Sequence, residues 1–169
     1  YSHRLIRPQT LSDLYQAYTI NPDLTEDLLN ELDEDGDFKY NYRRICKIIE
    51  LNEYSPELLD IAKKDTNTVY SLYDEKEENG DRRFSSNEIK DLYAWSKKLP
   101  NMLNKLMYQQ VYKVDRKYRF TGEQISFILE NYLKNPNYVK DVVFEKDDYT
   151  QYLYKGNEVC EKINAANKM

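Results

Sequence analysis

Two acidic stretches of the chain carry residue types that can bind a hard metal cation. The first, DEDGDFKY, spans residues 33–40, and the second, EENGDRRF, spans residues 77–84. Both have carboxylate or amide side chains at alternate positions, then a basic and an aromatic residue. Such side-chain oxygens are the ligands that Ca²⁺ prefers, although Asp, Asn and Gly are also ordinary turn residues. The chain has only four glycines, and two of them occupy the same place in these frames, so we expect a common local structure.

Apolar residues at helical spacing predict a helix on each side of both stretches. Ser55 and Pro56 predict a further helix start, with the helix running to about Tyr73. A last helix is expected from Glu158 to about Ala166, and the segment 142–154 reads as a short strand or an irregular segment. The residues that define the helices around the stretches are Leu24, Leu28, Leu29 and Leu32, then Ile45, Ile48, Ile49 and Leu51, then Val69, Leu72 and Tyr73, and finally Ile89, Leu92, Tyr93 and Trp95.

The helix starts are themselves repetitive. The sequences SSNE (85–88) and TGEQ (121–124) are capping boxes, in which a hydroxyl and a later Glu or Gln satisfy each other's backbone amides. The sequence NYRR (41–44) has the capping residue without the final acceptor. Each is followed by an isoleucine, at positions 45, 89 and 125, so the repeat has a period of about 36 to 44 residues, within the range of helical repeats.

These loops and helices resemble the EF-hand, in which a twelve-residue loop between two helices binds Ca²⁺ through oxygen ligands at positions 1, 3, 5, 7, 9 and 12. With Asp33 at position 1, the resemblance implies the ligands Asp33, Asp35 and Asp37 in the first loop. With Glu77 at position 1, it implies a fuller set in the second loop. That set consists of the side chains of Glu77, Asn79, Asp81, Ser85 and Glu88 and the backbone carbonyl of Arg83.

Both loops depart from the EF-hand pattern. The glycine stands at position 4, whereas the family places it at position 6. Arg44 occupies position 12 of the first loop, where the family has a bidentate glutamate, and would bring a cation towards the ion. Starting the first loop at Glu31 moves Gly36 to position 6 but puts Tyr42 at position 12. Glu88 also has an interpretation that needs no ion, as the last residue of a capping box.

The arrangement is similar to the sarcoplasmic calcium-binding proteins, since a Trp-bearing helix and a Leu-Pro break, AWSKKLP, separate two halves. We therefore expect one all-α domain over residues 1–169, made of paired helix–loop–helix repeats. The first EF-hand-like pair would cover residues 24–99, and a degenerate second half would cover residues 100–169.

Composition narrows the classes of function. The net charge is −5 and the isoelectric point is about 5.1, which argues against nucleic acid as the main partner because phosphate contacts need a basic face. No apolar run is long enough to suggest a membrane span. A start at Tyr1 leaves open whether a signal peptide has been removed, so a cytoplasmic and a secreted location are both compatible with the sequence.

The sequence offers few combinations of residues that could form a catalytic site. His3 is the only histidine, so the chain offers no Cys–His or Ser–His–Asp arrangement, and no zinc site can be built from histidine and cysteine. Cys46 and Cys160 could form a disulfide or remain two buried thiols. We therefore expect a non-enzymatic module.

These observations lead to one main hypothesis and two alternatives. The main hypothesis is an EF-hand-like module with degenerate loops that binds a protein partner, with calcium as a possible weak modulator. One alternative is a helical carrier that encloses a small apolar ligand among its 17 tyrosines. The other is a secreted interaction protein that binds no ion.

Overall fold

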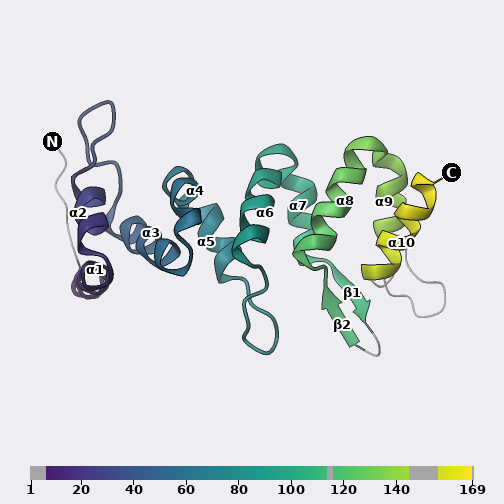
Figure 1. Cartoon of the computed structure of the whole chain (residues 1–169), viewed down its shortest axis with the longest axis horizontal. Helices are drawn as coiled ribbons and strands as arrows, with labels where there is room; N and C mark the ends of the chain where they lie inside the picture. The colour runs from purple at the N-terminus through teal and green to yellow at the C-terminus, as the bar shows by residue number, and fades with distance from the viewer. Residues whose placement is uncertain (1–6, 114–115, 145–155, 169) are drawn as a thin grey trace. The chain divides into compact units, whose positions relative to one another are not determined.

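The computed structural model describes residues 7–113, 116–144 and 156–168. Contacts divide the chain into an N-terminal unit that ends at Asp74 and a C-terminal unit that begins at Glu75. Nearly all regular structure in the described part is helical, which confirms the all-α fold class (Figure 1). The expected grouping into one domain, with halves at 24–99 and 100–169, stays a prediction.

The N-terminal unit consists of helices and one short 3₁₀ turn. Its elements are α1 (Pro8–Ile20), α2 (Pro22–Asn30), α3 (Tyr42–Tyr54), the 3₁₀ helix η1 (Pro56–Leu58), α4 (Leu59–Lys64) and α5 (Thr66–Asp74). Helix α3 packs against α1, α2 and α5.

The C-terminal unit adds a β-hairpin that the sequence interpretation missed. Its elements are α6 (Ser86–Lys98), α7 (Pro100–Tyr108), β1 (Gln110–Lys113), β2 (Arg116–Arg119), α8 (Gly122–Lys134), α9 (Pro136–Phe144) and α10 (Gly156–Asn167). Helix α8 packs against α6, α7, α9 and α10. The last helix was expected at 158–166 and is confirmed; within 142–154, residues 142–144 belong to α9 and the rest lie outside the described residues.

A single non-helical residue separates consecutive helices at four places. These residues are Asn21, Asp65, Leu99 and Asn135, with φ between −136° and −150° and ψ between 62° and 84°. Each donates its N–H to the carbonyl four residues earlier, so the preceding helix ends there. Three of them precede a proline, whose fixed φ suits the first residue of a new helix. We call α1, α3, α6, α8 and α10 the long helices and α2, α5, α7 and α9 the short helices.

The predicted helix from Ser55 to Tyr73 is wrong in two respects. The Ser55 side chain makes no capping hydrogen bond, and the segment after it begins with the 3₁₀ turn η1 instead of an α-helix. The helix then stops at Asp65, whose carboxylate accepts a hydrogen bond from Thr68 N at 3.3 Å. The hydroxyl of Thr66 binds the Ala62 carbonyl at 2.6 Å, in place of the backbone amide that a continuous helix would use. Side chains that compete for the backbone therefore divide the segment.

After α2, α5 and α7 the chain turns, places a buried aromatic residue before a cap, and starts the next long helix. The caps are Asn41, Ser85 and Thr121, each of which accepts a backbone amide. The aromatic residue before the cap and the isoleucine four residues after it are both buried, as in a hydrophobic staple. These pairs are Tyr40 and Ile45, Phe84 and Ile89, and Phe120 and Ile125. The repeat that the isoleucines predicted is thus present in the described chain.

Candidate functional site

The first acidic stretch closes on itself as a hairpin. Asp33 N donates to Asp37 O at 2.8 Å, and Gly36 N donates to Asp33 O at 3.1 Å. The Asp33 carboxylate accepts from the amides of Asp35 and Asp37 at 2.9 and 3.0 Å. This carboxylate therefore holds the turn together, and Asp35 lies exposed at the tip.

The second acidic stretch repeats this geometry. Glu77 N donates to Asp81 O at 2.7 Å, and Gly80 N donates to Glu77 O at 2.9 Å. The Asn79 side chain accepts from Asp81 N and donates to the Asp81 carboxylate, both at 3.0 Å. Both tips project away from the helices (Figure 1).

The turn explains the glycine in each frame. Gly36 has a φ of 85° and Gly80 a φ of 90°, which is the left-handed region that glycine enters without a steric cost. A tight turn followed by one left-handed residue is a common three-residue hairpin loop. The position of the glycine therefore follows from the hairpin.

The second predicted ligand set is divided between the hairpin tip and a helix cap. Ser85 Oγ accepts from Glu88 N at 3.2 Å, and Glu88 Oε1 accepts from Ser85 N at 2.9 Å. The carboxylate of Glu88 also lies so close to Gly122 that a Cβ there would stand 2.2 Å from Glu88 Oε2. The interpretation of residues 85–88 as a capping box is confirmed.

Neither predicted ligand set forms a ready metal centre. Across the described ranges no three His, Cys, Asp or Glu side chains are grouped so that they could hold a metal ion. Asp33, Asp35 and Asp37 lie on the first hairpin, and Glu77, Asn79 and Asp81 lie on the second. In each hairpin some of these side chains hold the turn through hydrogen bonds, and others face solvent. Calcium binding stays a prediction that a titration must test.

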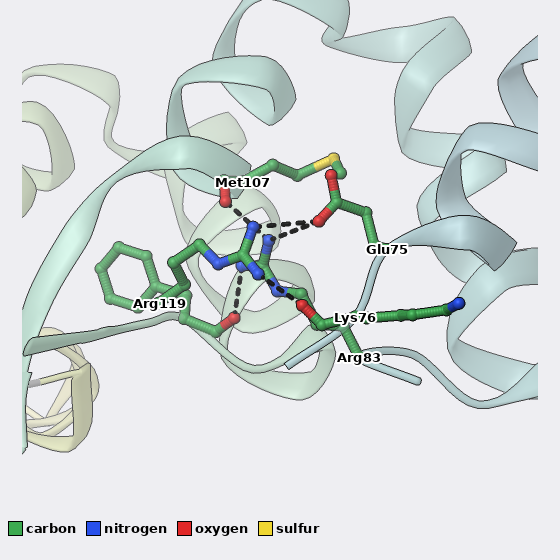
Figure 2. A network of polar contacts seen from close by, with 6 residues as sticks. Glu75, Lys76, Arg83, Met107 and Arg119 are labelled. Atoms are coloured by element: carbon green, nitrogen blue, oxygen red, sulfur yellow. Dashed lines mark hydrogen bonds and ion pairs between the residues drawn. The ribbon is translucent and has the colours of Figure 1, made fainter. Parts of the chain in front are cut away.

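A polar network at the base of the second hairpin was not anticipated from sequence. Arg83 donates to Met107 O and to Phe120 O, both at 2.7 Å. Arg119 donates to the Glu75 carboxylate at 2.9 Å and to Lys76 O at 2.8 Å. Figure 2 shows the two guanidinium groups beside each other, with Glu75 facing both. Arg83 lies 3.9 Å from Glu75, so its main partners are the two carbonyls.

Burial weakens the positive charge of Arg83. Removal from water, and then the neighbouring Arg119, lower the pKa of Arg83 to about 10, and Glu75 counteracts part of this effect. Arg83 is therefore still protonated at neutral pH. Because it joins the hairpin to the end of α7 and to the residue before the α8 cap, we interpret the network as a structural link between successive repeats.

The corresponding network in the N-terminal unit is more open to solvent. The Glu31 carboxylate pairs with Lys39 at 3.0 Å and with Lys63 at 3.2 Å, and it accepts the Tyr40 hydroxyl at 2.9 Å. Burial alone would raise the pKa of Glu31, but hydrogen bonds from Lys39, Tyr40 and Lys63 outweigh this and lower the pKa below its ordinary value. Glu31 thus acts here as the acceptor that Glu75 provides in the second hairpin.

Arg44, which the EF-hand alignment placed at an ion ligand position, serves helix packing. Its Nε donates to the Thr66 hydroxyl at 2.7 Å, and its Nη2 donates to the Lys63 carbonyl. Its guanidinium also lies 4.7 Å from the centre of the Tyr40 ring. Arg44 therefore joins α3 to the junction of α4 and α5.

A groove of ≈ 580 Å³ lies on α1 and α3 in the N-terminal unit, and Tyr70 of α5 is among the residues that line it. Its cationic side chains are Arg7, Arg43 and Lys47, and its carboxylates are Asp13 and Glu50. Lys47 lies 5.0 Å from the centre of the Tyr70 ring, and the Tyr70 hydroxyl donates to Glu50 at 3.3 Å. Sequence reasoning missed this groove because it depends on how α1 packs on α3.

Cys46 in the N-terminal unit and Cys160 in the C-terminal unit are both free, half-buried thiols in this structure. Cys46 lines the groove and is half-buried, so the expectation that it is a buried residue of helix α3 is met only in part. Burial, and then the nearby Asp13 carboxylate, raise the pKa of the Cys46 thiol. Burial likewise raises the pKa of Cys160 to about 11. Neither thiol is activated as a nucleophile.

Comparisons with known proteins identify no relative of this chain. No protein-family model matches the chain, and neither a curated protein nor a solved structure matches it. Among the described helices, none combines the length and the hydropathy that crossing a bilayer requires.

Proposed function

We propose that this protein is a non-enzymatic helical-repeat module that binds a segment of a partner protein in the groove on α1 and α3. The observation that carries the proposal is the groove itself, whose walls combine cations, carboxylates and a tyrosine on two packed helices. Such a mixture suits a peptide, which offers both side-chain charges and backbone groups.

The charges favour a partner segment that carries an acidic residue. Arg43 is exposed and makes no hydrogen bond or ion pair among the described contacts of this unit. Lys47 contacts the Tyr70 ring and leaves its ammonium donors for a ligand. An Asp or Glu of the partner would supply the acceptors that these two cations lack, and a guanidinium can bind a carboxylate through two hydrogen bonds.

The lining agrees less well with the alternative of a carrier for a small apolar ligand. Pockets for such ligands are lined mostly by apolar and aromatic side chains. Here the aliphatic contribution comes from Ala17, Ile20 and Ile49, and charged or amide side chains form most of the remainder. Native mass spectrometry of protein purified from its source would reveal a retained small molecule and thereby support the carrier.

A selection of peptides on the immobilised chain, followed by calorimetry with the best binder, tests the proposal. The double variant Arg43→Glu and Lys47→Glu should weaken binding by about tenfold or more, which corresponds to about 1.4 kcal/mol. Lys64→Glu is the matched control, because Lys64 is exposed on α4 of the same unit and does not line the groove. An equal loss in both variants, or selected peptides that do not bind this unit, would refute the groove as the site.

Calcium modulation and EF-hand descent are separate parts of the hypothesis. Both loops keep carboxylates that could accept Ca²⁺, although each also forms a self-contained turn. Trp95 lies on α6, the helix that follows the second hairpin, so its fluorescence should respond if that hairpin binds an ion. Calorimetry with millimolar Ca²⁺ that gives no heat, together with unchanged melting and fluorescence, would remove calcium from the proposal and leave the groove untouched.

A further inference from the structure

A second concavity lies in the C-terminal unit and is lined by α6 and α8, which pack against each other (Figure 1). Its volume is ≈ 260 Å³, smaller than the roughly 300 Å³ or more of a pocket for a drug-sized ligand, so it suits a single side chain. We call it the Trp95 pocket. Its lining residues are Asp91, Ala94, Trp95 and Lys98 of α6, and Ser126 and Glu130 of α8.

The lining combines an indole ring with two unpaired carboxylates. Trp95 is half-buried, so part of its ring is open to a ligand. The carboxylates of Asp91 and Glu130 are exposed, and neither makes a hydrogen bond or an ion pair with another described residue. The face of an indole attracts cations, and carboxylates accept strong hydrogen bonds from them. The residue types of the pocket therefore favour a positively charged group.

A cation of the chain itself already lies on the ring. Lys98 Nζ is 5.6 Å from the centre of the Trp95 ring, which is within the range of a cation–π contact. Lys98 is exposed, and among the described residues it forms no ion pair with Asp91 or Glu130. The two carboxylates of the pocket are thus left without a cation. A ligand that reaches both the ring and a carboxylate can displace Lys98, whose own hold on the ring is exposed to solvent.

The charge of the Trp95 pocket is opposite to that of the groove on α1 and α3. The groove is lined by three cations and two carboxylates, whereas the pocket is lined by two carboxylates and one ammonium. The groove belongs to the N-terminal unit and the pocket to the C-terminal unit. We therefore treat the pocket as a separate site, with a preference for a different chemical group.

We propose that the Trp95 pocket binds an arginine side chain of a partner protein. A guanidinium is planar, so it can stack on the indole face while its N–H groups donate to the carboxylates of Asp91 and Glu130. It is also more weakly hydrated than an ammonium, which lowers the cost of leaving water. Binding displaces Lys98 from the ring and supplies the positive charge that the two carboxylates lack.

The fluorescence of Trp95 tests the proposal directly, because the chain has no other tryptophan. The probe is a blocked pentapeptide, Gly-Gly-Arg-Gly-Gly, added to the full chain in the presence of a chelator so that no metal ion contributes. It should change the fluorescence saturably at millimolar concentrations. The matched peptide with citrulline in place of arginine has nearly the same shape without the charge, and it should cause no saturable change. The lysine peptide should bind several-fold more weakly, because an ammonium lacks the planar fork.

Variants of the lining residues test which groups bind the peptide. The double variant Asp91→Asn with Glu130→Gln should weaken binding about tenfold, and it should fold normally because both side chains are exposed. Glu123→Gln with Glu161→Gln is the matched control, because these carboxylates are exposed in the same unit but do not line the pocket. Lys98→Met should strengthen binding about threefold, because it removes the cation that competes for the ring.

Each of the opposite outcomes would overturn the inference. Equal responses to the arginine and citrulline peptides would exclude recognition of the charge, and lysine binding as tightly as arginine would exclude the planar fork as its basis. Equal losses in the two double variants would assign the effect to the net charge of the unit. Weaker binding by the Lys98→Met variant would show that the ring is not the surface that the peptide uses. No saturable change at millimolar arginine peptide would show that the pocket does not accept this side chain.

Discussion

The two acidic hairpins have nearly the same turn but different surroundings at their bases. In the first hairpin the basic residue is Lys39, whose side chain is 46% exposed and pairs with Glu31. At the same place in the second hairpin stands Arg83, whose side chain is 1% exposed and binds the carbonyls of Met107 and Phe120. The hairpin frame therefore does not decide whether its basic residue lies at the surface or in the interior.

The difference teaches how a turn that occurs twice in one chain can take on different structural roles. A guanidinium has five donors in a planar fork, so Arg83 can bind two carbonyls and still face a carboxylate. An ammonium is a compact, strongly hydrated charge, and Lys39 keeps it near water. We expect Arg83 to be essential to its unit and Lys39 to be replaceable.

The largest expected effect comes from removing the buried guanidinium. Arg83→Met should cost the C-terminal unit about 3 kcal/mol, because two buried carbonyls lose their donor and Glu75 loses a nearby cation. Urea unfolding monitored by circular dichroism measures this loss. Lys39→Met is the control, and it should destabilise the N-terminal unit far less because its ion pair is exposed to solvent. Similar losses in the two variants would contradict the comparison.

Exchanging the two basic residues should give a smaller and asymmetric effect. Arg83→Lys should cost about 1–3 kcal/mol, since one ammonium cannot reach both carbonyls from the same position. Lys39→Arg should leave the unfolding midpoint nearly unchanged, because either cation can pair with Glu31 at the surface. If Arg83→Lys were neutral, the two-carbonyl geometry would not matter to stability.

The glycine of each turn should matter equally in the two hairpins. Gly36→Ala and Gly80→Ala should each cost about 1 kcal/mol, because a side chain disfavours the left-handed conformation. No atom lies within 4 Å of the added Cβ at either site, so no steric term should separate them. Thermal melting of both variants tests the shared turn, and unequal losses would show that the tips differ after all.

The smallest expected effect is on how the stability of the N-terminal unit depends on pH. The pKa of Glu31 in the folded chain is lowered from its ordinary value of 4.5, so its contribution to stability is present above that pH and is lost as the pH falls through the folded pKa. Glu31→Gln should therefore flatten the acid side of the stability curve of the N-terminal unit. Glu34→Gln, at the exposed hairpin tip, should leave the curve unchanged, and an equal response of both variants would dismiss the network as its cause.

Local sequence signals predicted much of the fold. The capping box at residues 85–88 was identified correctly because its hydrogen bonds join groups three residues apart. The break at Asp65 was missed, since the apolar periodicity of residues 58–73 continues through it and only side-chain competition for the backbone ends the helix. The β1–β2 hairpin was missed too, because its eight strand residues contain only one aliphatic residue, Val111.

By itself the sequence determined the parts whose partners are near neighbours along the chain. Gly36 and Gly80 set the turns, and Asn41, Ser85 and Thr121 set the helix starts. Only the tertiary structure decided that Arg83 is buried, because its acceptors, Met107 O and Phe120 O, lie 24 and 37 residues away. It likewise decided that Leu11 of α1 is exposed where Ile45, at the same position of α3, is buried, since the burial of a helix face depends on which elements pack on it.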